Sequence, residues 1–586
     1  MRANPSRRRS LYPAPEGPFT TIADGGRARA RIVVPAGATA LEQFAARELQ
    51  ACLLRIGDAA LPIEPEGDQP GEGCYTFYTG ATRRAAAARV PSGERTLGRD
   101  GFVLRSEPGG LIIRGRNDLG TVFGVYELLE RAFDVRWFMP GEAGEHVPRR
   151  ARVRIGQYRL VFKPAFRVRW VGKGEWSLRQ RMNAYVTADG RSVGIPWKWH
   201  FHTFRILMPP ERYFADHPDY YALVNGKREL TASQTHGNQL CTSHPGVIRE
   251  LSRNLIAALD AEPETEIVTL SPNDGGGFCE CARCHALDEP GRDWFARYSR
   301  RLAIFNNEVA TRVARRHPNV LIKVGAYAMY ARPPADPAWR PAPNLFFQLC
   351  HLYFCHNHAL AGDGCRAGVT YDPDRARFLP NQTFRELVRQ WRKRSPHLFI
   401  YEYYAIGGMA RAGLPWPLLH TLLADIPWYR DEGVEGFYTQ LDDTLWHRLG
   451  LNYYLAAKLC WNPDLDPQAL LDDTFRKGYG RAAAPMRACI LAMERAMEQW
   501  NQCVSYGLFG ESGEAFGYFL TQVLTPAVLA RMERHLARAE HLVAGDAARA
   551  ARVALTRRML DETRRNLAAR RAAPPPPPPP PEVEHF

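Results

Sequence analysis

Hydrophobic and polar positions divide the chain into regions of different periodicity. Over residues 29–150, short strand-like runs alternate with two stretches, 41–56 and 118–133, in which apolar residues recur at helical spacing. The turn-forming segment Glu-Pro-Gly-Gly at 107–110 separates two apolar runs and predicts a hairpin. These elements predict a small α/β sandwich domain.

From residue 151 to 462, short apolar runs alternate with helical stretches, which is typical of a parallel sheet whose crossovers are helices. Strands are expected at residues 166–171, 183–186, 239–242, 266–271, 320–326, 344–349, 398–403 and 434–440. About eight such units over roughly 300 residues is the count of a TIM-type (β/α)8 barrel. We therefore predict an α/β protein with a (β/α)8 barrel at its centre.

The remaining segments carry no strand pattern. Residues 463–572 have helical periodicity throughout and predict a helical C-terminal region. Residues 1–28 are rich in Pro, Gly and Arg, and residues 573–586 contain an unbroken proline run. We expect both ends to be disordered, the second as an extended polyproline tail.

Composition and charge exclude several classes of function. Hydrophobic residues make up 45% of the 586 residues and charged residues 24%, which is typical of globular proteins. The net charge of +15 comes mostly from Arg in Ala-rich helical stretches, which favours solvated helix faces. No recognition motif accompanies this charge, so we expect no nucleic-acid partner. No apolar run is long enough for a membrane helix, and we expect no membrane partner.

The sequence lacks the patterns of an export signal and of nucleotide binding. The basic residues at 7–9 are followed by Pro-rich sequence and not by the apolar stretch of an export signal, so we expect a cytoplasmic protein. The sequence has no phosphate-binding loop, no G-x-G-x-x-G and no G-x-S-x-G motif. This argues against nucleotide-dependent and serine-esterase chemistry.

Several segments together resemble known families. Residues 41–49, 120–130 and 137–141 read LEQFAAREL, GTVFGVYELLE and WFMPG. They resemble the N-terminal domain that precedes the barrel in β-hexosaminidases and α-glucuronidases. The middle of the chain resembles a bacterial family known as domain of unknown function 4838, which overlaps glycoside hydrolase family 163. The matching segments are HTF at 202–204, YFADHP at 213–218, YALVNGK at 221–227, SPNDGGG at 271–277, CECARC at 279–284 and LCWNP at 459–463.

This resemblance implies hydrolysis of a glycosidic bond. Characterised members of the family look like endo-acting β-N-acetylglucosaminidases on N-glycans, so the implied substrate is an oligosaccharide with a β-linked N-acetylhexosamine. The chemistry needs a carboxylic acid that protonates the leaving oxygen, and it requires no cofactor. The alternative function is a catalytically inactive carbohydrate-binding protein on the same scaffold.

Asp274 is the first candidate for the acid. It follows the predicted strand 266–271, and the carboxyl ends of barrel strands face the active site. In β-hexosaminidases the matching strand ends in an Asp-Glu pair, whose Asp orients the substrate's acetamido group. The pair here is Asn273-Asp274, so we expect Asp274 to be the general acid and Asn273 to orient the substrate. The alternative is structural, because Asn-Asp-Gly is also a strong turn signal.

Glu402 is the second candidate carboxylate. It stands in the sequence Tyr-Glu-Tyr-Tyr at 401–404, where an aromatic wall would raise a carboxyl pKa by desolvation. We interpret Glu402 as a base, a nucleophile or a ligand of a sugar hydroxyl, and Tyr404 as a substrate contact. An exposed charge at the strand end is the alternative for Glu402.

Two further carboxylates, Asp442 and Asp443, follow the last predicted strand. Adjacent residues in a strand point to opposite faces, so at most one of them enters the pocket unless the chain has already turned. The family that the sequence resembles often carries Glu where Thr439 stands. A catalytic Glu at that position would have been lost here or moved to Asp442 or Asp443.

Aromatic residues are dense between residues 197 and 221. Sugar rings stack their C–H faces on flat aromatic rings, and histidine binds hydroxyl groups. We expect Trp199, His202 and Trp446 to contact the substrate. The alternative is that some of these rings are core residues beneath a long loop.

Cysteines form two groups. Cys279, Cys281 and Cys284 lie within six residues and can ligate a structural Zn²⁺, with His285, Cys241 or a residue of segment 351–358 as the fourth ligand. A local disulfide or packed thiols are the alternatives. His351, Cys355, His356, His358 and Cys365 form a second dense patch, which could line the pocket or join a metal site.

Overall fold

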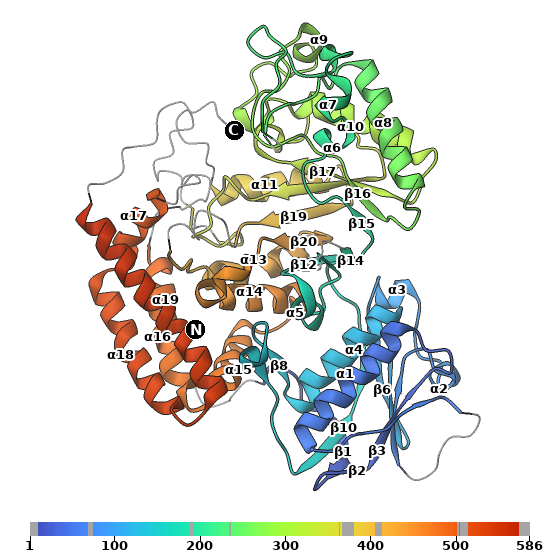
Figure 1. Cartoon of the computed structure of the whole chain (residues 1–586), viewed down its shortest axis with the longest axis vertical. Helices are drawn as coiled ribbons and strands as arrows, with labels where there is room; N and C mark the ends of the chain where they lie inside the picture. The colour runs from blue at the N-terminus through green and yellow to red at the C-terminus, as the bar shows by residue number, and fades with distance from the viewer. Residues whose placement is uncertain are drawn as a thin grey trace.

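The computed structural model describes residues 10–67, 74–186, 192–233, 236–362, 364–365, 380–404, 413–500, 503 and 514–573. Residues 574–586 of the expected polyproline tail lie outside this part of the chain. Figure 1 shows a small sheet with two helices at the N-terminal end, a central sheet, and a group of long helices formed by the C-terminal part.

The N-terminal part is a six-stranded sheet with helices packed on it. The spatial order of its strands is β11-β6-β7-β5-β3-β4. Their bounds are β3 (Ala30–Val34), β4 (Ile63–Pro65), β5 (Tyr75–Thr79), β6 (Phe102–Glu107), β7 (Gly110–Gly115) and β11 (Arg159–Phe162). The predicted helices are α1 (Ala40–Gly57) and α4 (Asp118–Phe133), which pack against each other over the sheet (Figure 1). Thr39 and Glu42 form a capping box that fixes the start of α1.

The expectation that residues 1–28 are disordered is corrected within the described part of the segment. β1 (Glu16–Asp24) pairs antiparallel with β10 (Arg152–Gln157) and with β2 (Arg27–Ala28). Ile22 in β1 is fully buried. The partner β10 is distant in sequence, so local composition gave no sign of this pairing.

The central sheet has seven parallel strands in the order β12-β20-β19-β18-β17-β16-β15. Their bounds are β12 (Val168–Val171), β15 (Trp197–Lys198), β16 (Ile267–Thr269), β17 (Leu321–Ala326), β18 (Leu345–Cys350), β19 (Leu398–Glu402) and β20 (Gly436–Thr439). The order follows the chain around a ring, as in a (β/α) barrel. Among the described residues no ladder joins the edge strands β12 and β15, although Trp170 and Trp197 meet across the gap with ring centroids 5.9 Å apart. The sheet is therefore a curled half-barrel, and a closed eight-stranded barrel is not confirmed.

Six of the eight predicted strands belong to this sheet, and two do not. Segment 183–186 is β13 (Ala184–Val186), which pairs antiparallel with β14 (Ser192–Gly194) outside the curled sheet. Segment 239–242 contributes only an isolated bridge between Tyr221 and Leu240. The two-residue strand β15 was not predicted, because it is too short to show alternation.

The two faces of the curled sheet have different neighbours. On the inner face, Phe399 and Tyr401 of β19 contact Trp197 and Tyr438. On the outer face, Phe347 of β18 stacks on Trp391 of the helix α11 (Asn381–Arg392). Because side chains alternate along a strand, neighbouring residues of β18 and β19 lie in entirely different surroundings.

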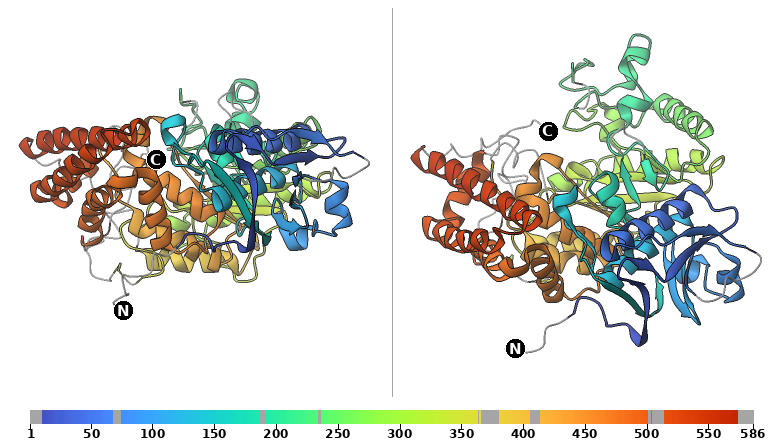
Figure 2. Two further views of the ribbon diagram at one scale, coloured as in Figure 1. Left: turned by 90° about the horizontal axis from the view of Figure 1, so that it is seen from below. Right: turned by 60° about the horizontal axis from the view of Figure 1, so that its bottom comes forward.

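Helices cover the outer face and extend into the C-terminal part. The longer ones are α8 (Pro245–Asp260), α10 (Ser299–Ala314), α11 (Asn381–Arg392), α13 (Leu419–Asp431), α14 (Trp446–Trp461), α15 (Pro467–Tyr479), α16 (Ala483–Glu498), α17 (Glu514–Val523), α18 (Pro526–Val543) and α19 (Ala547–Ala572). Short elements complete the chain: β8 (Arg136–Trp137), β9 (Glu145–His146), α2 (Arg83–Ala87), α3 (Glu94–Leu97), α5 (Gly174–Arg179), α6 (Phe204–Leu207), α7 (Pro210–Tyr213) and α9 (Ala282–His285). Both views in Figure 2 place the red C-terminal helices on one side of the sheet and the blue N-terminal part on the other. No helix in the described part has the length and apolar character needed to span a bilayer.

Candidate active site

The segment after β16 carries the candidate acid to the carboxyl end of the curled sheet. The backbone of Asp274 forms a parallel bridge with His236, and Gly237 donates its N–H to the Asp274 carbonyl. The side chain is about one-third exposed, at 31%. Its Oδ1 accepts the N–H of Gly275 at 3.0 Å, which fixes the carboxylate in the turn. Oδ2 is the oxygen beside His202 and His236, at the carboxyl end of the curled sheet, hereafter the mouth.

Two histidines flank that oxygen. The Nε2 atoms of His202 and His236 lie 3.7 Å and 3.6 Å from Asp274 Oδ2. Nδ1 of His202 lies 2.7 Å from the carbonyl oxygen of Pro272 and donates its proton there. The backbone oxygen therefore fixes a proton on Nδ1, and Nε2 is the ring nitrogen that faces the carboxylate. The separations of 3.6–3.7 Å are longer than a hydrogen bond, so the two rings flank the carboxylate at ion-pair distance.

Asn273 does not reach the substrate side of this segment. Its Nδ2 donates to the carbonyl oxygens of Gly237 and Asn238, at 3.0 Å and 3.1 Å. Its Oδ1 accepts the backbone N–H of Arg205. Both amide protons are thus used to join the loop before Asp274 to its neighbours. This geometry replaces the expected substrate-orienting role with a structural one.

Tyrosines and a cysteine lie on the inner side of Asp274. Burial raises the pKa of Tyr330, and the charges of Cys350 and Asp274 raise it further. The pKa of Tyr327 is raised by burial, with Tyr353 and Asp274 adding to the effect. Both phenols therefore stay protonated near neutral pH. They are neutral phenols close enough to Asp274 to feel its charge.

Aromatic rings line the inner face of the sheet. Trp170 contacts His200 and Tyr438 with ring centroids 4.7 Å apart in each case. Tyr401 lies 4.6 Å from Tyr438 and 6.0 Å from Phe201, which is itself exposed. Sequence reasoning missed Trp170 and Tyr438. The alternation of side chains along β12 and β20 could have found them, because it assigns every second residue of each strand to the inner face.

A lysine lies at the base of this aromatic lining. Nζ of Lys323 in β17 donates to the carbonyl oxygen of His200 at 2.5 Å and to Oε1 of Gln348 at 2.8 Å. Burial lowers the pKa of Lys323 to about 7. Burial, together with the charge of Lys323, lowers the pKa of His200 to about 4, so His200 stays neutral.

Glu402 points away from Asp274, which corrects its assignment as the second catalytic carboxylate. It accepts hydrogen bonds from Tyr429 of α13 and from Nδ1 of His351 at 3.1 Å, and it is fully buried. Burial alone would raise the pKa of Glu402, but the cationic His351 and the hydrogen bonds outweigh it and leave the pKa lowered. The strand's alternation explains the error, because Tyr401 on its inner side means Glu402 on its outer side.

Tyr404 is also displaced from the expected position. It is buried, and its backbone N–H donates to Oγ1 of Thr439 at 3.1 Å. Thr439 pairs with Glu402 in the β19–β20 ladder and is fully buried. The inner-face residue at this end of β20 is Gln440, whose Nε2 donates to Tyr401 Oη at 2.5 Å.

The carboxylates after β20 serve local structure. Asp442 Oδ1 accepts the N–H and the hydroxyl of Thr444, at 2.8 Å and 2.6 Å, and so caps the turn before α14. Asp443 pairs with Lys173 at the surface, at 3.1 Å. Neither contact brings a carboxylate to Asp274.

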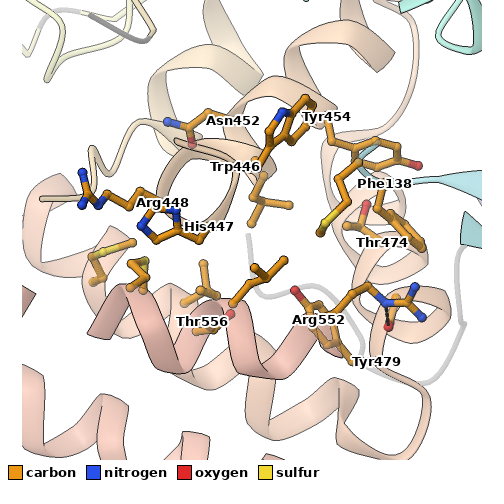
Figure 3. A pocket seen from close by; sticks show the side chains of 18 of the residues that line it. Phe138, Trp446, His447, Arg448, Asn452, Tyr454, Thr474, Tyr479, Arg552 and Thr556 are labelled. Carbon is orange, nitrogen blue, oxygen red and sulfur yellow. Dashed lines mark hydrogen bonds between the residues drawn. The ribbon is translucent and has the colours of Figure 1, made fainter. Parts of the chain in front are cut away.

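Trp446 lines a different pocket, among the C-terminal helices. Figure 3 shows Trp446, His447 and Arg448 on one side of this pocket and Arg552 on another. His447 is bound to Glu562 of α19 at 2.7 Å. Trp199 stands beside Lys198, whose Nζ lies 5.1 Å from its ring centroid, and Lys198 pairs with Glu262. Of the three predicted contacts, the structure brings only His202 to Asp274.

The cysteine group is completed by Cys241. Sγ atoms of Cys241, Cys279, Cys281 and Cys284 all lie within 4.8 Å of one another. Cys241 Sγ is 3.7 Å from that of Cys281 and 3.8 Å from that of Cys284. A tetrahedral zinc site with Zn–S of about 2.3 Å has sulfur atoms about 3.8 Å apart. His285 is exposed and pairs with Asp288, so it is not the fourth member.

Comparison with known families places the chain. A family model described as domain of unknown function (DUF4838) matches residues 139–492, which is more than half of the chain. The chain belongs to the DUF4838 family. A second model, described as the glycosyl hydrolase family 67 N-terminus, matches residues 21–128, most of the N-terminal sheet domain. No curated protein matches this DUF4838 chain.

Solved structures of glycoside hydrolases are similar to this DUF4838 protein at low sequence identity. One is BtGH115A, a family GH115 4-O-methyl-α-glucuronidase with specificity for decorated arabinogalactans. It is 12% identical, covers 94% of this chain and 73% of its own, and has a TM-score of 0.54. Another is the GH20 β-N-acetylhexosaminidase of Streptomyces coelicolor A3(2), at 12% identity, 81% and 96% coverage and a TM-score of 0.42. The likeness to the first shows that the chain has a fold found in glycoside hydrolases.

Proposed function

We propose that this DUF4838 protein hydrolyses a glycosidic bond of an oligosaccharide at the carboxyl end of its curled sheet, with Asp274 as the proton donor. The observation that carries the proposal is the position of Asp274 Oδ2, partly exposed after β16 and facing His202 and His236. Active sites of barrel enzymes lie at this end of the strands. The fold shared with a glucuronidase supports the same reading.

Proton transfer at this site begins with Asp274, which lies between two histidines. A general acid must hold a proton before the glycosidic oxygen leaves. Asp274 gives its proton to the leaving oxygen and regains one from the water molecule that completes hydrolysis, so the acid is restored without another donor. His202 and His236 line the site beside it. The aromatic lining of Trp170, Phe201 and Tyr401 then offers flat surfaces for the sugar ring.

The substrate class follows from the groups around the acid. Retaining and inverting glycosidases both use a second carboxylate across the bond. Among the residues that the structure describes, Glu402, Asp442 and Asp443 do not fill this role. A substrate whose own 2-acetamido group attacks the anomeric carbon removes the need for a protein nucleophile. We therefore propose a β-linked N-acetylhexosamine, with the protonated phenols of Tyr327 and Tyr330 as candidate donors to the acetamido group.

A second candidate function is sugar binding without catalysis. It is favoured by Gln440, an amide on the inner face at the end of β20, bound to Tyr401. With an amide at that strand end, the described mouth retains one carboxylate beside an aromatic wall. Such a site would recognise a glycan without cleaving it.

Mass spectrometry of a glycan pool tests both functions. The pool contains N-glycans and β-linked oligosaccharides, and it is incubated with the wild type, Asp274→Asn and Asp443→Asn. We expect the wild type and the surface control Asp443→Asn to cleave, and Asp274→Asn to lose about 10²–10⁴-fold in kcat/KM. Equal cleavage by Asp274→Asn would refute the assignment of the acid. If none cleaves but a glycan raises the melting temperature of the wild type, the binding function holds instead.

We also propose that Cys241, Cys279, Cys281 and Cys284 hold a structural Zn²⁺. The sulfur separations fit a tetrahedral site, and three of the four cysteines follow Asp274 in the chain. Cys279 Sγ accepts the backbone N–H of Leu223 at 3.3 Å, which orients one thiolate. A zinc ion here would hold the segments on both sides of the mouth together.

A further inference from the structure

A second group of metal-ligating side chains is separate from the four-cysteine cluster. Nδ1 of His358 lies 3.3 Å from Cys355 Sγ, 3.6 Å from Cys365 Sγ and 3.6 Å from Cys503 Sγ. All four ligand atoms lie within 4.8 Å of one another. We propose that Cys355, His358, Cys365 and Cys503 bind a Zn²⁺ ion that ties the segment after β18 to the segment after α16. The proposal does not depend on the proposed function.

The spacing of the four atoms fits one ion. In a tetrahedral site with Zn–S of about 2.3 Å and Zn–N of about 2.0–2.1 Å, a sulfur and a nitrogen atom are about 3.6 Å apart. The three sulfur–nitrogen distances around His358 are 3.3, 3.6 and 3.6 Å. A disulfide would bring two sulfurs to about 2.05 Å, and no disulfide joins any described cysteines. Three thiolates and one imidazole are a common donor set of structural zinc.

Burial favours a permanent ion. Cys355 and Cys365 are buried, and His358 and Cys503 are half-buried. The ligands come from two parts of the chain, and two of the three thiolates are closed off from solvent. Structural zinc sites are closed in this way, with protein ligands at every position.

The backbone around the ligands is held by other contacts. Asn381 of α11 donates to the carbonyl oxygen of His358 at 2.6 Å, and Gln382 donates to that of Cys365. Asn357, next to His358, donates to the carbonyl oxygen of Trp500 at 2.7 Å. Trp500 is three residues before Cys503. The ligands are therefore brought together across about 140 residues of sequence by hydrogen bonds that do not involve the metal.

The neighbouring His351 and His356 lie beside Glu402 and are not part of this cluster. His351 uses Nδ1 for Glu402 and Nε2 for Asn381 Oδ1, each at 3.1 Å. His356 stands 3.9 Å from Glu402 on the same outer face of the sheet. The dense sequence patch at 351–365 therefore divides into a buried ion pair and a metal-binding set. The fourth ligand, Cys503, comes from a part of the chain that the patch itself does not indicate.

Metal content tests the proposal directly. The full chain is expressed with zinc in the medium and purified without chelator. Zinc per chain is then measured by inductively coupled plasma mass spectrometry. We expect two zinc ions in the wild type and one in Cys503→Ser. The control Cys74→Ser removes an exposed thiol outside both clusters and should retain two. Unchanged zinc in Cys503→Ser, or a native disulfide among Cys355, Cys365 and Cys503, would overturn the proposal.

A second measurement guards against a variant that does not fold. Cys281→Ser removes a ligand of the four-cysteine cluster and should leave one ion, at the site around His358. Adding His358→Gln to this variant should remove that ion as well. Cobalt exchanged into Cys281→Ser should give thiolate-to-cobalt absorption and the intense visible bands of a tetrahedral site. The same exchange into Cys503→Ser should give the stronger thiolate absorption of a four-cysteine site. Identical spectra for both single variants would show that only one kind of site exists and would overturn the proposal.

Discussion

In β19 the side chains of Tyr401 and Glu402 point to opposite faces of the sheet, and this one-residue step separates two kinds of chemistry. Tyr401 joins the aromatic lining of the mouth, while Glu402 joins His351 and Tyr429 between the sheet and the helices. An acidic residue in aromatic sequence looks catalytic in both positions. Only the register of the strand distinguishes them.

Glu402→Gln is expected to destabilise the fold. It leaves the buried His351 without its charged partner, and removing one member of a buried pair costs about 3–5 kcal/mol. The folded pKa of Glu402 is lowered and that of His351 is raised. The stability from Glu402 is therefore lost as pH falls through its folded pKa, and that from His351 is lost as pH rises through its own.

Urea unfolding over a pH series measures this effect. The difference between wild type and Glu402→Gln should be largest between about pH 4.3 and 6.5, the unfolded values of the two groups. Glu435→Gln, at a partly exposed carboxylate paired with His397, is the matched control and should cost less than about 1 kcal/mol. Full stability in Glu402→Gln would contradict the buried pair.

Lys323→Met is expected to stabilise the protein at neutral and acid pH. Burial lowers the folded pKa of Lys323 to about 7, against about 10.4 when unfolded. Between these values the unfolded state binds more protons, so wild-type stability rises with pH. Removing the charge should gain about 1–3 kcal/mol below pH 7, after the loss of the hydrogen bonds to His200 and Gln348.

Thermal unfolding between pH 6 and 10 measures this change. The advantage of Lys323→Met over the wild type should shrink as pH rises. Lys227→Met, at an exposed lysine, should show no such slope. If Lys323→Met unfolds at a lower temperature than the wild type at pH 6, the argument from the burial of Lys323 is contradicted.

At the residue scale, the sequence indicated part of the group around the candidate acid. Asp274 and His202 were both named, and the structure places them together. Asn273 was assigned by analogy with an Asp that orients a substrate, but an amide also satisfies three backbone groups, and it does so here. His236 carried no signal, because it reaches Asp274 through an isolated bridge.

At the scale of elements, the strands of the curled sheet were predictable because they are apolar on both faces and lie between helices. The failures were short or isolated. β15 has two residues, and segment 239–242 forms a single bridge at Leu240. Segment 183–186 has the apolar run of a strand but pairs with its own hairpin partner. Local patterns specify a strand and leave its partner to the tertiary fold.

Metal removal is expected to loosen one group of loops around the mouth. Cys241 and the segment 279–284 lie outside the long helices and strands, so we expect a chelator to increase hydrogen exchange at residues 221–224 and 279–284. The backbone N–H of Leu223, which donates to Cys279 Sγ, should respond most.

Cys281→Ser should produce the same increase without chelator. Exchange in the N-terminal sheet, for example in β5 and β7, should be unchanged and serves as the internal control. Equal exchange before and after chelation at residues 221–224 would contradict a structural ion at this cluster.

At the scale of the whole molecule, the basic composition has an internal explanation in part. Arg136, Arg169 and Arg181 are buried and form ion pairs with acids from distant segments. The sequence suggested solvated arginine faces, which fits the exposed residues of α19. It could not show that other arginines join the N-terminal domain to the rest, since their partners lie up to 337 residues away.

The helix α4 is the centre of this junction. Glu130 accepts hydrogen bonds from Arg181, from Lys458 of α14 and from the hydroxyl of Tyr12, and it is fully buried. Glu127, one turn earlier, accepts from the indole of Trp461. The N-terminal domain is thus held to the curled sheet and to the helices by charges that have no access to water. We infer that these parts unfold together.

Glu130→Gln tests that inference. The substitution leaves Arg181 and Lys458 buried with one charge fewer, so we expect a loss of about 3–5 kcal/mol. The neighbouring cations lower the pKa of Glu130 despite its burial, so its contribution is present above the unfolded pKa and is lost as pH falls toward the folded one. Calorimetry at pH 7 should show one transition in the wild type, and a lower or divided one in the variant. Glu94→Gln, at an exposed acid of the same domain, should keep the wild-type profile. Two separate transitions in the wild type would mean that the buried charges position the N-terminal domain without coupling its stability to the sheet that carries Asp274.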